Sequence, residues 1–233
     1  MKVFNSDYDI LMDSYILLHS YKEYNDYDGT YFRLLINIDT EKFIDKYIKA
    51  TTKRKSYFTH NEGNYLNNIW KESEKIINII LKKVLKIENK WKRNKILKEI
   101  FDYQEEISSI QEEYLEELIL DKISDEHIIE ILFDILSERS EECRIKCINK
   151  YLENNKNLND FKKISLESMT FSWSGSEVPL IEKRIKYYTR LNESIKKLGI
   201  IYIRHNAYIE EIIDGLHQKK KAVLRREFIE DWI

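Results

Sequence analysis

Four glutamates near the middle of the chain have a spacing that two-carboxylate chemistry can use. They form the run EExxEE, at Glu112, Glu113, Glu116 and Glu117. Carboxylate pairs one helical turn apart can hold Mg²⁺ together with the phosphate of a substrate. A glutamate run is also what composition alone supplies in a strongly acidic stretch, where it forms a solvated helix face. We therefore predict no metal site here, and we interpret the run as a surface that binds another protein.

A second candidate for chemistry is the Arg-x5-His spacing of Arg54 and His60. It resembles the catalytic motif of the HEPN ribonucleases, which are helical proteins in which an arginine and a histidine act together on the RNA phosphate. The polar residue that commonly follows the arginine in that family is replaced by Lys55. Five histidines, three allowed spacings and ten arginines in 233 positions give about 0.6 matches by chance, so one match carries no signal. We therefore predict no catalytic residue, and we keep a HEPN-like ribonuclease as an alternative beside a plain polar loop.

The two cysteines, Cys143 and Cys147, lie four residues apart on one face of a predicted helix. A metal site needs three or four ligands, and neither a third cysteine nor a nearby histidine accompanies them. We expect both to be buried as small hydrophobic residues, and we predict no metal and no cofactor. Two cysteines cannot form a disulfide framework, and the N-terminus has acidic residues where a signal peptide carries positive charge. Both features indicate the cytoplasm.

The string SWSGS at 172–176 places small hydroxyl residues just before a predicted helix. Free backbone N–H groups at such a helix start can hold an anion, with Ser174 and Ser176 beside it. The string lacks the GK[ST] ending of a phosphate-binding loop. Its other interpretation is a tight turn in which Ser176 caps a helix that tolerates Pro179 in its first turn and Trp173 is buried beneath.

Basic residues gather in the last third of the chain. The candidates for binding are Lys183, Arg184, Lys219, Lys220 and Arg225. Side chains of this kind can contact a phosphate backbone, so nucleic-acid binding is an alternative function. They can equally pair with the acidic helices of 99–142, or with an acidic surface of a partner protein. We favour these last two interpretations.

The elements that must position these residues are predicted to be helices. The chain has 233 residues, 42% of them hydrophobic and 34% charged, with five glycines and one proline. All-β folds need frequent turn residues, and a Rossmann-like fold needs glycines at its phosphate turns. The scarcity of both residues predicts an all-α protein with a sizeable core. No run of about eighteen apolar residues occurs, so we expect no membrane partner.

Apolar spacing divides the chain into helices joined by short breaks. Pairs of helices are expected within 31–48, 114–136 and 144–167, each with a polar or acidic cap between its two members. Pairs that recur along a chain are typical of a helical solenoid. A clean amphipathic pattern also predicts one continuous helix over 64–84.

Two other patterns interrupt the helices. Residues 51–64 are polar and aperiodic, which predicts a loop. Residues 169–173 alternate apolar and polar side chains, and residues 200–203 are a short apolar run, so both predict a very short extended segment. We expect residues 1–233 to form one all-α unit, with possible internal boundaries at 51–64 and 169–176.

Charge is segregated along the sequence. Residues 65–98 hold ten basic and three acidic residues, residues 99–142 hold two basic and sixteen acidic, and residues 177–226 hold twelve basic and six acidic. The net charge of −2 conceals this basic–acidic–basic layout. We therefore expect the acidic centre to be the main binding face.

The helix–break–helix pattern resembles the HEAT-like helical-repeat proteins. Segments of this sort, including ones with an SWSGS-like turn, also resemble the non-catalytic ends of larger bacterial multidomain proteins. The resemblance implies a scaffold or sensor module and no enzyme. We therefore expect a non-catalytic scaffold that binds a protein through its acidic central face.

Overall fold

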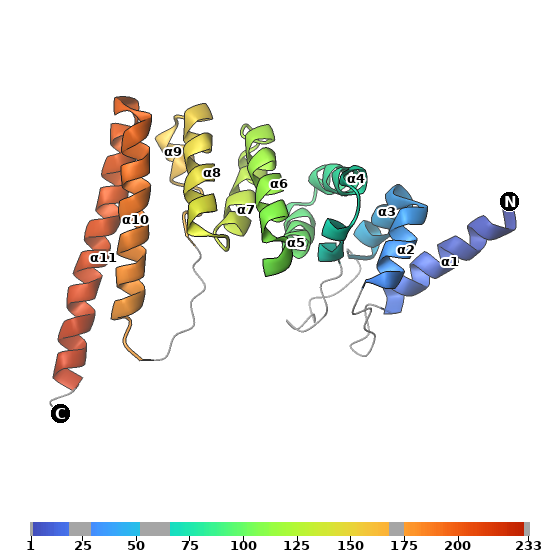
Figure 1. Ribbon diagram of the computed structural model, residues 1–233, viewed down its shortest axis with the longest axis horizontal. Helices are drawn as coiled ribbons and strands as arrows, with labels where there is room; N and C mark the ends of the chain where they lie inside the picture. The colour runs from blue at the N-terminus through green and yellow to red at the C-terminus, as the bar shows by residue number, and fades with distance from the viewer. Residues whose placement is uncertain (1, 19–28, 52–65, 168–174, 231–233) are drawn as a thin grey trace. The chain divides into compact units, whose positions relative to one another are not determined.

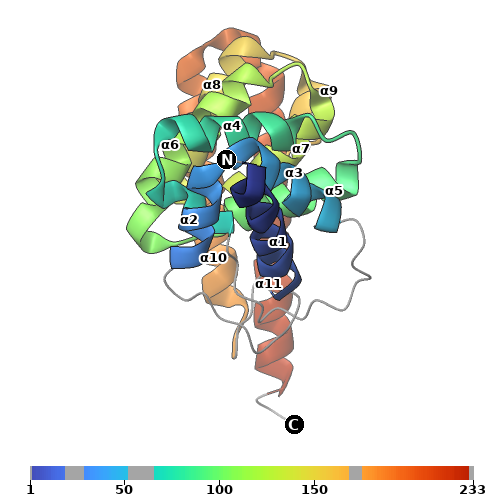
Figure 2. The same cartoon turned by 90° about the vertical axis from the view of Figure 1, so that its right-hand side faces the viewer.

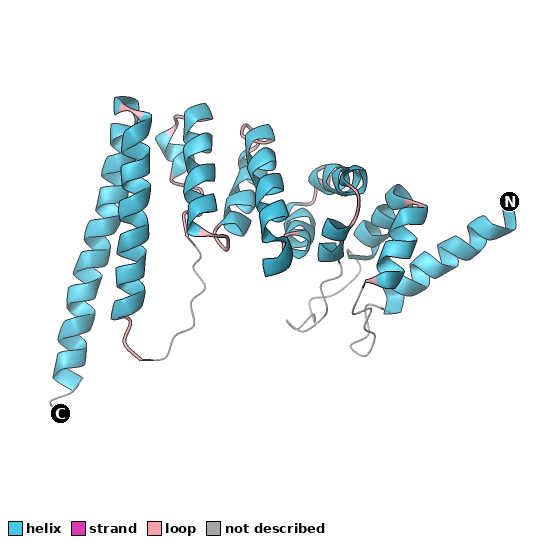
Figure 3. Cartoon of the chain, viewed as in Figure 1, coloured by secondary structure: helices cyan, strands magenta, loops and turns pink. Residues whose placement is uncertain are grey.

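The computed structural model describes residues 2–18, 29–51, 66–167 and 175–230 (Figure 1). Over these ranges the chain consists of helices and connecting turns and contains no strand (Figure 3). The predicted all-α fold is therefore confirmed for this part of the chain. The chain divides into two compact units, Met1–Gln111 and Glu112–Ile233. The expected single unit over 1–233 stays a prediction, and so does its boundary at 51–64, nearly all of which lies outside the described residues.

The first unit holds five α-helices, two short 3-10 helices and the first turn of a sixth α-helix in its described ranges. Their bounds are α1 Lys2–Leu18, α2 Thr30–Ile38, α3 Thr40–Thr51, η1 Leu66–Lys71, α4 Glu74–Leu85, α5 Lys90–Ile100, η2 Glu105–Ile107 and the start of α6, Ser108–Asp121. The core is apolar and partly aromatic, with Phe32 and Phe43 in an edge-to-face contact at 5.5 Å between ring centroids. Such contacts add to the free energy that burial itself supplies.

The amphipathic stretch at 64–84 is not one helix, contrary to our expectation. The 3-10 helix η1 ends at Lys71, and Ser73 takes an extended conformation as the N-cap of α4. Between them, the Glu72 carboxylate accepts hydrogen bonds from Arg33 at 2.6 Å and from Asn37 at 2.7 Å. These contacts from α2 hold the break in place, and such contacts override a local helical pattern.

The predicted breaks between paired helices are confirmed at two places. Asp39 separates α2 from α3, and its carboxylate accepts the backbone N–H of Lys42 at 3.0 Å. Asp125 is the N-cap of α7 and accepts the N–H of Ile128 at 3.1 Å. Each cap satisfies a donor that the helix itself leaves free, which is why an acidic residue marks these positions in the sequence.

The second unit contains the rest of α6 and the helices after it. They are α7 Glu126–Leu136, α8 Glu141–Asn154, α9 Leu158–Phe161, α10 Val178–Leu198, η3 Ile200–Tyr202 and α11 Ile203–Glu230. The two longest, α10 and α11, lie side by side as an antiparallel hairpin (Figures 1 and 2). The Tyr202 hydroxyl donates to the Leu152 carbonyl at 2.9 Å and so ties the turn of the hairpin to the end of α8.

The extended segment predicted at 200–203 is wrong. Residues Ile200–Tyr202 form a 3-10 turn that leads directly into α11. Gly199 ends α10 with φ of 122°, which favours glycine and turns the chain sharply enough for the next helix to begin at once. The other predicted extended segment, 169–173, lies outside the described residues. None of the described helices combines the length and apolar character needed to cross a membrane.

Candidate interaction surfaces

The EExxEE run on α6 is divided between two different faces of the helix. Glu112 accepts a hydrogen bond from the Ser140 hydroxyl at 3.1 Å, at the start of α8. Glu116 pairs with Lys146 at 2.7 Å and with Lys150, both on α8. These two glutamates therefore hold α6 against α8 and are not part of an open acidic surface.

The other two glutamates of the run face solvent. Glu113 and Glu117 are exposed, and Asp121 is exposed one turn further along the same helix face. Asp121 has an ion pair with the adjacent Lys122, at 2.6 Å, whereas no ion pair of Glu113 or Glu117 occurs within the described ranges. We call Glu113, Glu117 and Asp121 the acidic stripe. Within the EExxEE run, Glu113 and Glu117 are the two glutamates that a partner can reach.

The predicted basic residues also divide into two groups. Lys219 pairs with Glu177 at 3.1 Å, and Lys220 pairs with Glu182 at 2.6 Å, where it lowers the pKa of that carboxyl. Both pairs link α11 to the start of α10. Lys183 and Arg225 are exposed, and the structure gives neither an ion pair in the residues it describes.

Arg184 is a structural residue and not the surface contact that we predicted. Its guanidinium pairs through Nε at 2.9 Å with both oxygens of Glu167, a carboxylate only 7% exposed. The Glu167 carboxylate raises the pKa of Arg184 above its ordinary value. Beside this pair, the Tyr187 hydroxyl donates to the Leu166 carbonyl at 2.5 Å, and burial raises the pKa of Tyr187. The cluster fixes the segment after α9 onto α10.

Pairing of the basic C-terminal helices with the acidic block 99–142 is limited. Arg190 reaches Glu141 at 3.1 Å, but Arg184, Lys219 and Lys220 pair with carboxylates outside that block. The partners of Lys219 and Lys220 lie at the start of the same hairpin, and Glu167, the partner of Arg184, lies before it in the chain. Coulomb attraction falls with distance, so these near carboxylates are used. Block charges therefore did not predict the actual partners.

Exposed bases line an open groove of about 600 Å³ along α10. Lys183, Lys186 and Arg190 follow one another on one side of the helix, and His217 and Lys220 come from α11. Glu182 and Glu193 also line it. Since Lys220 is engaged with Glu182, and Arg190 with Glu141, Lys183 and Lys186 are the groove's available positive charges.

The start of α10 partly matches the sequence interpretation. The N-cap of the helix is Glu177 and not Ser176, but the Ser176 hydroxyl accepts the backbone N–H of Val178 at 3.1 Å, and Pro179 lies in the first turn. This supports the capped-turn interpretation, because the hydroxyl occupies one of the donors that an anion would need. Ser174 and Trp173, and likewise Arg54 and His60, lie outside the described residues.

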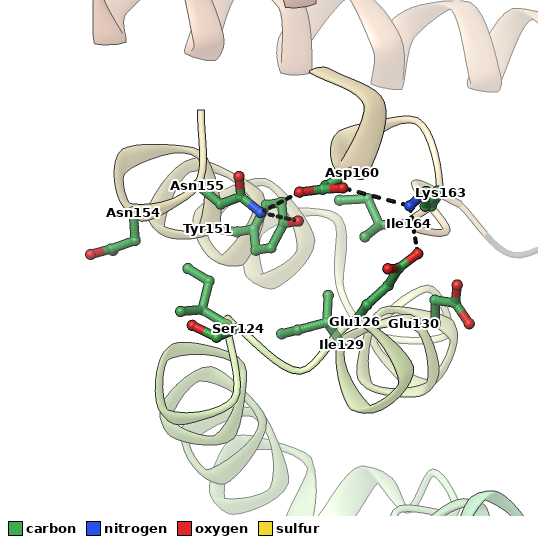
Figure 4. Close-up of a pocket in the computed structure, with 11 residues that line it drawn as sticks. Ser124, Glu126, Ile129, Glu130, Tyr151, Asn154, Asn155, Asp160, Lys163 and Ile164 are labelled. Atoms are coloured by element: carbon green, nitrogen blue, oxygen red, sulfur yellow. Dashed lines mark hydrogen bonds and ion pairs between the residues drawn. The ribbon is translucent and has the colours of Figure 1, made fainter. Parts of the chain in front are cut away.

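A small polar cavity of about 230 Å³ was not predicted at all (Figure 4). It lies between the α6–α7 turn, α7, the end of α8 and α9, with Ile123, Ile129 and Ile164 among its lining residues. Asn155 donates to the Tyr151 hydroxyl at 2.9 Å and to Asp160 at 3.3 Å. Lys163 bridges Glu126 and Asp160.

The chemistry open to this cavity is hydrogen bonding. Burial and the nearby Asp160 carboxylate raise the pKa of Tyr151 to about 12, so its phenol stays protonated at neutral pH. Lys163 forms ion pairs with both Glu126 and Asp160, so each of these two carboxylates is already engaged with a cation. In the sequence, the contributing NNKNLND stretch at 154–160 indicates only a turn between two helices. The other walls of the cavity come from residues about thirty positions away, so no local pattern predicts it.

Both cysteines are buried, as expected, and they form no disulfide with each other. Cys147 is fully buried on α8, and its hydrogen bond with Cys143, together with burial, raises its pKa. Within the described ranges, no group of three or more histidines, cysteines and carboxylates is placed to hold a metal ion. No family model, no curated protein and no solved structure matches the chain. The surfaces above are therefore interpreted from their own geometry.

Proposed function

We propose that the chain is a non-catalytic interaction module that binds a basic surface of another protein through the acidic stripe. The observation that carries this proposal is the division of the EExxEE run. Glu112 and Glu116 are used to hold α8, whereas Glu113 and Glu117 are exposed beside Asp121. Internal packing accounts for the first two glutamates and leaves the stripe without a structural role.

The like charges of the acidic stripe lower the stability of α6 when no partner is bound. Like charges four residues apart on a helix destabilise it by about 0.2–0.5 kcal/mol per pair. The stripe contains two such pairs, Glu113 with Glu117 and Glu117 with Asp121. A basic partner would offset this repulsion. The complementary charges would also speed association and make binding more specific for a basic partner.

The proposal includes a HEAT-like arrangement of the helix pairs. The pairs α2–α3 and α6–α7 each turn at a single acidic cap, which supports a repeated helix–break–helix unit. In such arrays, each repeat contacts its neighbours, and an extended face stays available for binding.

Reversing two stripe charges tests the proposal. The Glu113→Lys, Glu117→Lys double variant is expected to capture its protein partners from its own cells at least roughly tenfold less than the original chain, because it would repel a basic surface. Affinity capture quantified by mass spectrometry measures this, followed by titration of the most depleted protein in purified form. Far-UV circular dichroism should not change, since both side chains are exposed.

The matched control is Glu211→Lys with Asp214→Lys, two exposed carboxylates on α11 that receive the same change of charge. This control variant should capture the same proteins in the same amounts as the original chain. Equal loss in both double variants would mean that net charge alone is being measured, and undiminished capture by the stripe variant would remove the stripe as the binding surface.

The second candidate function is nucleic-acid binding in the groove along α10. The observation that favours it is the pair of exposed lysines, Lys183 and Lys186, beside Arg190. Contacts of this kind to phosphates weaken steeply as salt rises, because binding releases counterions. The groove's Glu182 and Glu193 oppose it, so we rank it below the acidic stripe.

Lys183→Glu with Lys186→Glu is expected to abolish the salt-dependent binding of single-stranded RNA in a fluorescence-anisotropy titration. A control of equal charge is Lys82→Glu with Lys86→Glu, an exposed residue of α4 and the exposed residue that caps its C-terminus. Absence of binding by the original chain at low salt would dispose of this candidate. Binding lost equally in the control would assign it to net charge.

A further inference from the structure

The turn between α10 and α11 exposes three isoleucines within four residues. Ile200, Ile201 and Ile203 are 83%, 58% and 63% exposed. Tyr202, between them, is instead buried, with its hydroxyl bonded to Leu152. We call Ile200, Ile201 and Ile203 the apolar tip. Leaving several aliphatic side chains in water at one apex is unfavourable, and clustered exposure of this kind marks an interaction site.

The residues around the apolar tip are basic and contain no acid. From 194 to 209 the chain has Lys196, Lys197 and Arg204 and neither aspartate nor glutamate, although 41 of its 233 residues are acidic. Lys197 and Arg204 are exposed, while Lys196 pairs with Glu210 at 2.8 Å. The nearby acidic groups come from outside this segment, at Glu153, Glu193 and Glu210.

We propose that the apolar tip docks on an anionic membrane surface. Its aliphatic side chains would enter the boundary between headgroups and acyl chains. Lys197 and Arg204, each about one helical turn from the apex, would contact the lipid phosphates. Apolar burial and attraction to anionic lipid together determine such binding. Long basic side chains suit this position, because their stems bury while their charges stay in water.

The geometry of the turn suits a flat surface. The apolar tip lies at the end of a two-helix hairpin, where α10 and α11 meet, so its exposed isoleucines gather at one apex (Figure 1). Gly199 holds the turn at φ of 122°, which keeps η3 close to the helix ends. Contact of this kind is peripheral and needs no membrane-spanning helix. The proposal differs from our sequence-based expectation of no membrane partner.

Two other occupants fit the charges and side chains less well. A second copy joined tip to tip would bring Lys197 and Arg204 against their equivalents, and like charges facing one another disfavour the contact. Protein interfaces draw much of their binding energy from aromatic anchors, and the one aromatic side chain of the turn, Tyr202, faces the core. The proposal is separate from the proposed function, since it uses other residues at another place.

Cosedimentation of the full chain with vesicles tests the inference. Vesicles of phosphatidylcholine with about 30% phosphatidylglycerol should bind the chain, and phosphatidylcholine alone should bind it at least roughly tenfold less. The triple variant Ile200→Ser, Ile201→Ser, Ile203→Ser should lose binding to both. Lys197→Glu with Arg204→Glu should remove the difference between the two vesicle types.

The control removes exposed apolar groups elsewhere on α11, as Leu224→Ser with Phe228→Ser, and should bind like the original chain. No binding of the original chain to anionic vesicles, or equal binding by the triple variant, would overturn the inference. It would also be overturned if ultracentrifugation without vesicles showed an oligomer that the triple variant abolishes, because a second copy would then occupy the tip.

Discussion

Replacing Arg184 by alanine is expected to lower the free energy of unfolding by about 3–5 kcal/mol. The change leaves the Glu167 carboxylate, 7% exposed, without its cationic partner. A buried charge that has lost its partner costs far more than the pair contributes, because the desolvation penalty remains and the attraction is gone. Urea unfolding followed by circular dichroism measures the difference.

The adjacent Lys183→Ala variant is the control for Arg184. Lys183 is exposed, so its loss should change the free energy of unfolding by less than about 0.5 kcal/mol. Replacing both partners, as Arg184→Met with Glu167→Met, should restore much of the stability, since no unpaired charge remains. If Arg184→Ala were as stable as Lys183→Ala, Arg184 would be a surface residue, as the sequence alone predicted.

Replacing Trp70 by alanine should cost about 3–5 kcal/mol of unfolding free energy in the first unit. The side chain is 4% exposed, its ring centroid lies 5.0 Å from that of Phe101, and its Nε1 donates to the Ile100 carbonyl at 2.7 Å. Alanine would leave a cavity and an unsatisfied buried carbonyl oxygen. Trp70→Phe should cost less, because it keeps most of the packing and loses only the hydrogen bond.

Trp91 provides a control of the same residue type. It is 60% exposed, and its ring has the Lys95 ammonium 5.7 Å from the centroid. Its replacement by alanine should cost no more than about 1 kcal/mol, which is the size of an exposed cation–π contact. Equal loss of stability in the Trp70 and Trp91 variants, measured by urea unfolding, would contradict the burial described for η1 and α5.

The two tryptophans also show which sequence feature predicts burial. Both are large apolar residues in stretches with helical apolar spacing, and residue type alone would place both in the core. In α5 the buried positions are Lys92, Arg93, Ile96, Leu97 and Ile100. Extended back from Ile96 and Ile100, this phase reaches Lys92 and Arg93 and leaves Trp91 on the outer face. The helical phase therefore predicts the exposure of Trp91, whereas residue type alone does not.

Charge blocks predicted which segments are acidic but not what each carboxylate does. Glu116 and Glu117 are neighbours of the same type in the same block. One pairs with two lysines of α8, and the other faces solvent. Successive residues on a helix point about 100° apart, so only the direction of the neighbouring helix decides which one is used.

The sequence by itself determined the all-α fold, the acidic caps at Asp39 and Asp125, and the burial of Cys143 and Cys147. Each of these features depends on residues a few positions apart, through apolar periodicity and cap hydrogen bonds, so it can be predicted from a short stretch of sequence. Only the tertiary structure decided the buried Arg184–Glu167 pair, the cavity beside Tyr151, the acidic stripe and the apolar tip. Each of these depends on which faces of separate helices are covered by others, and that is a property of packing rather than of any one segment.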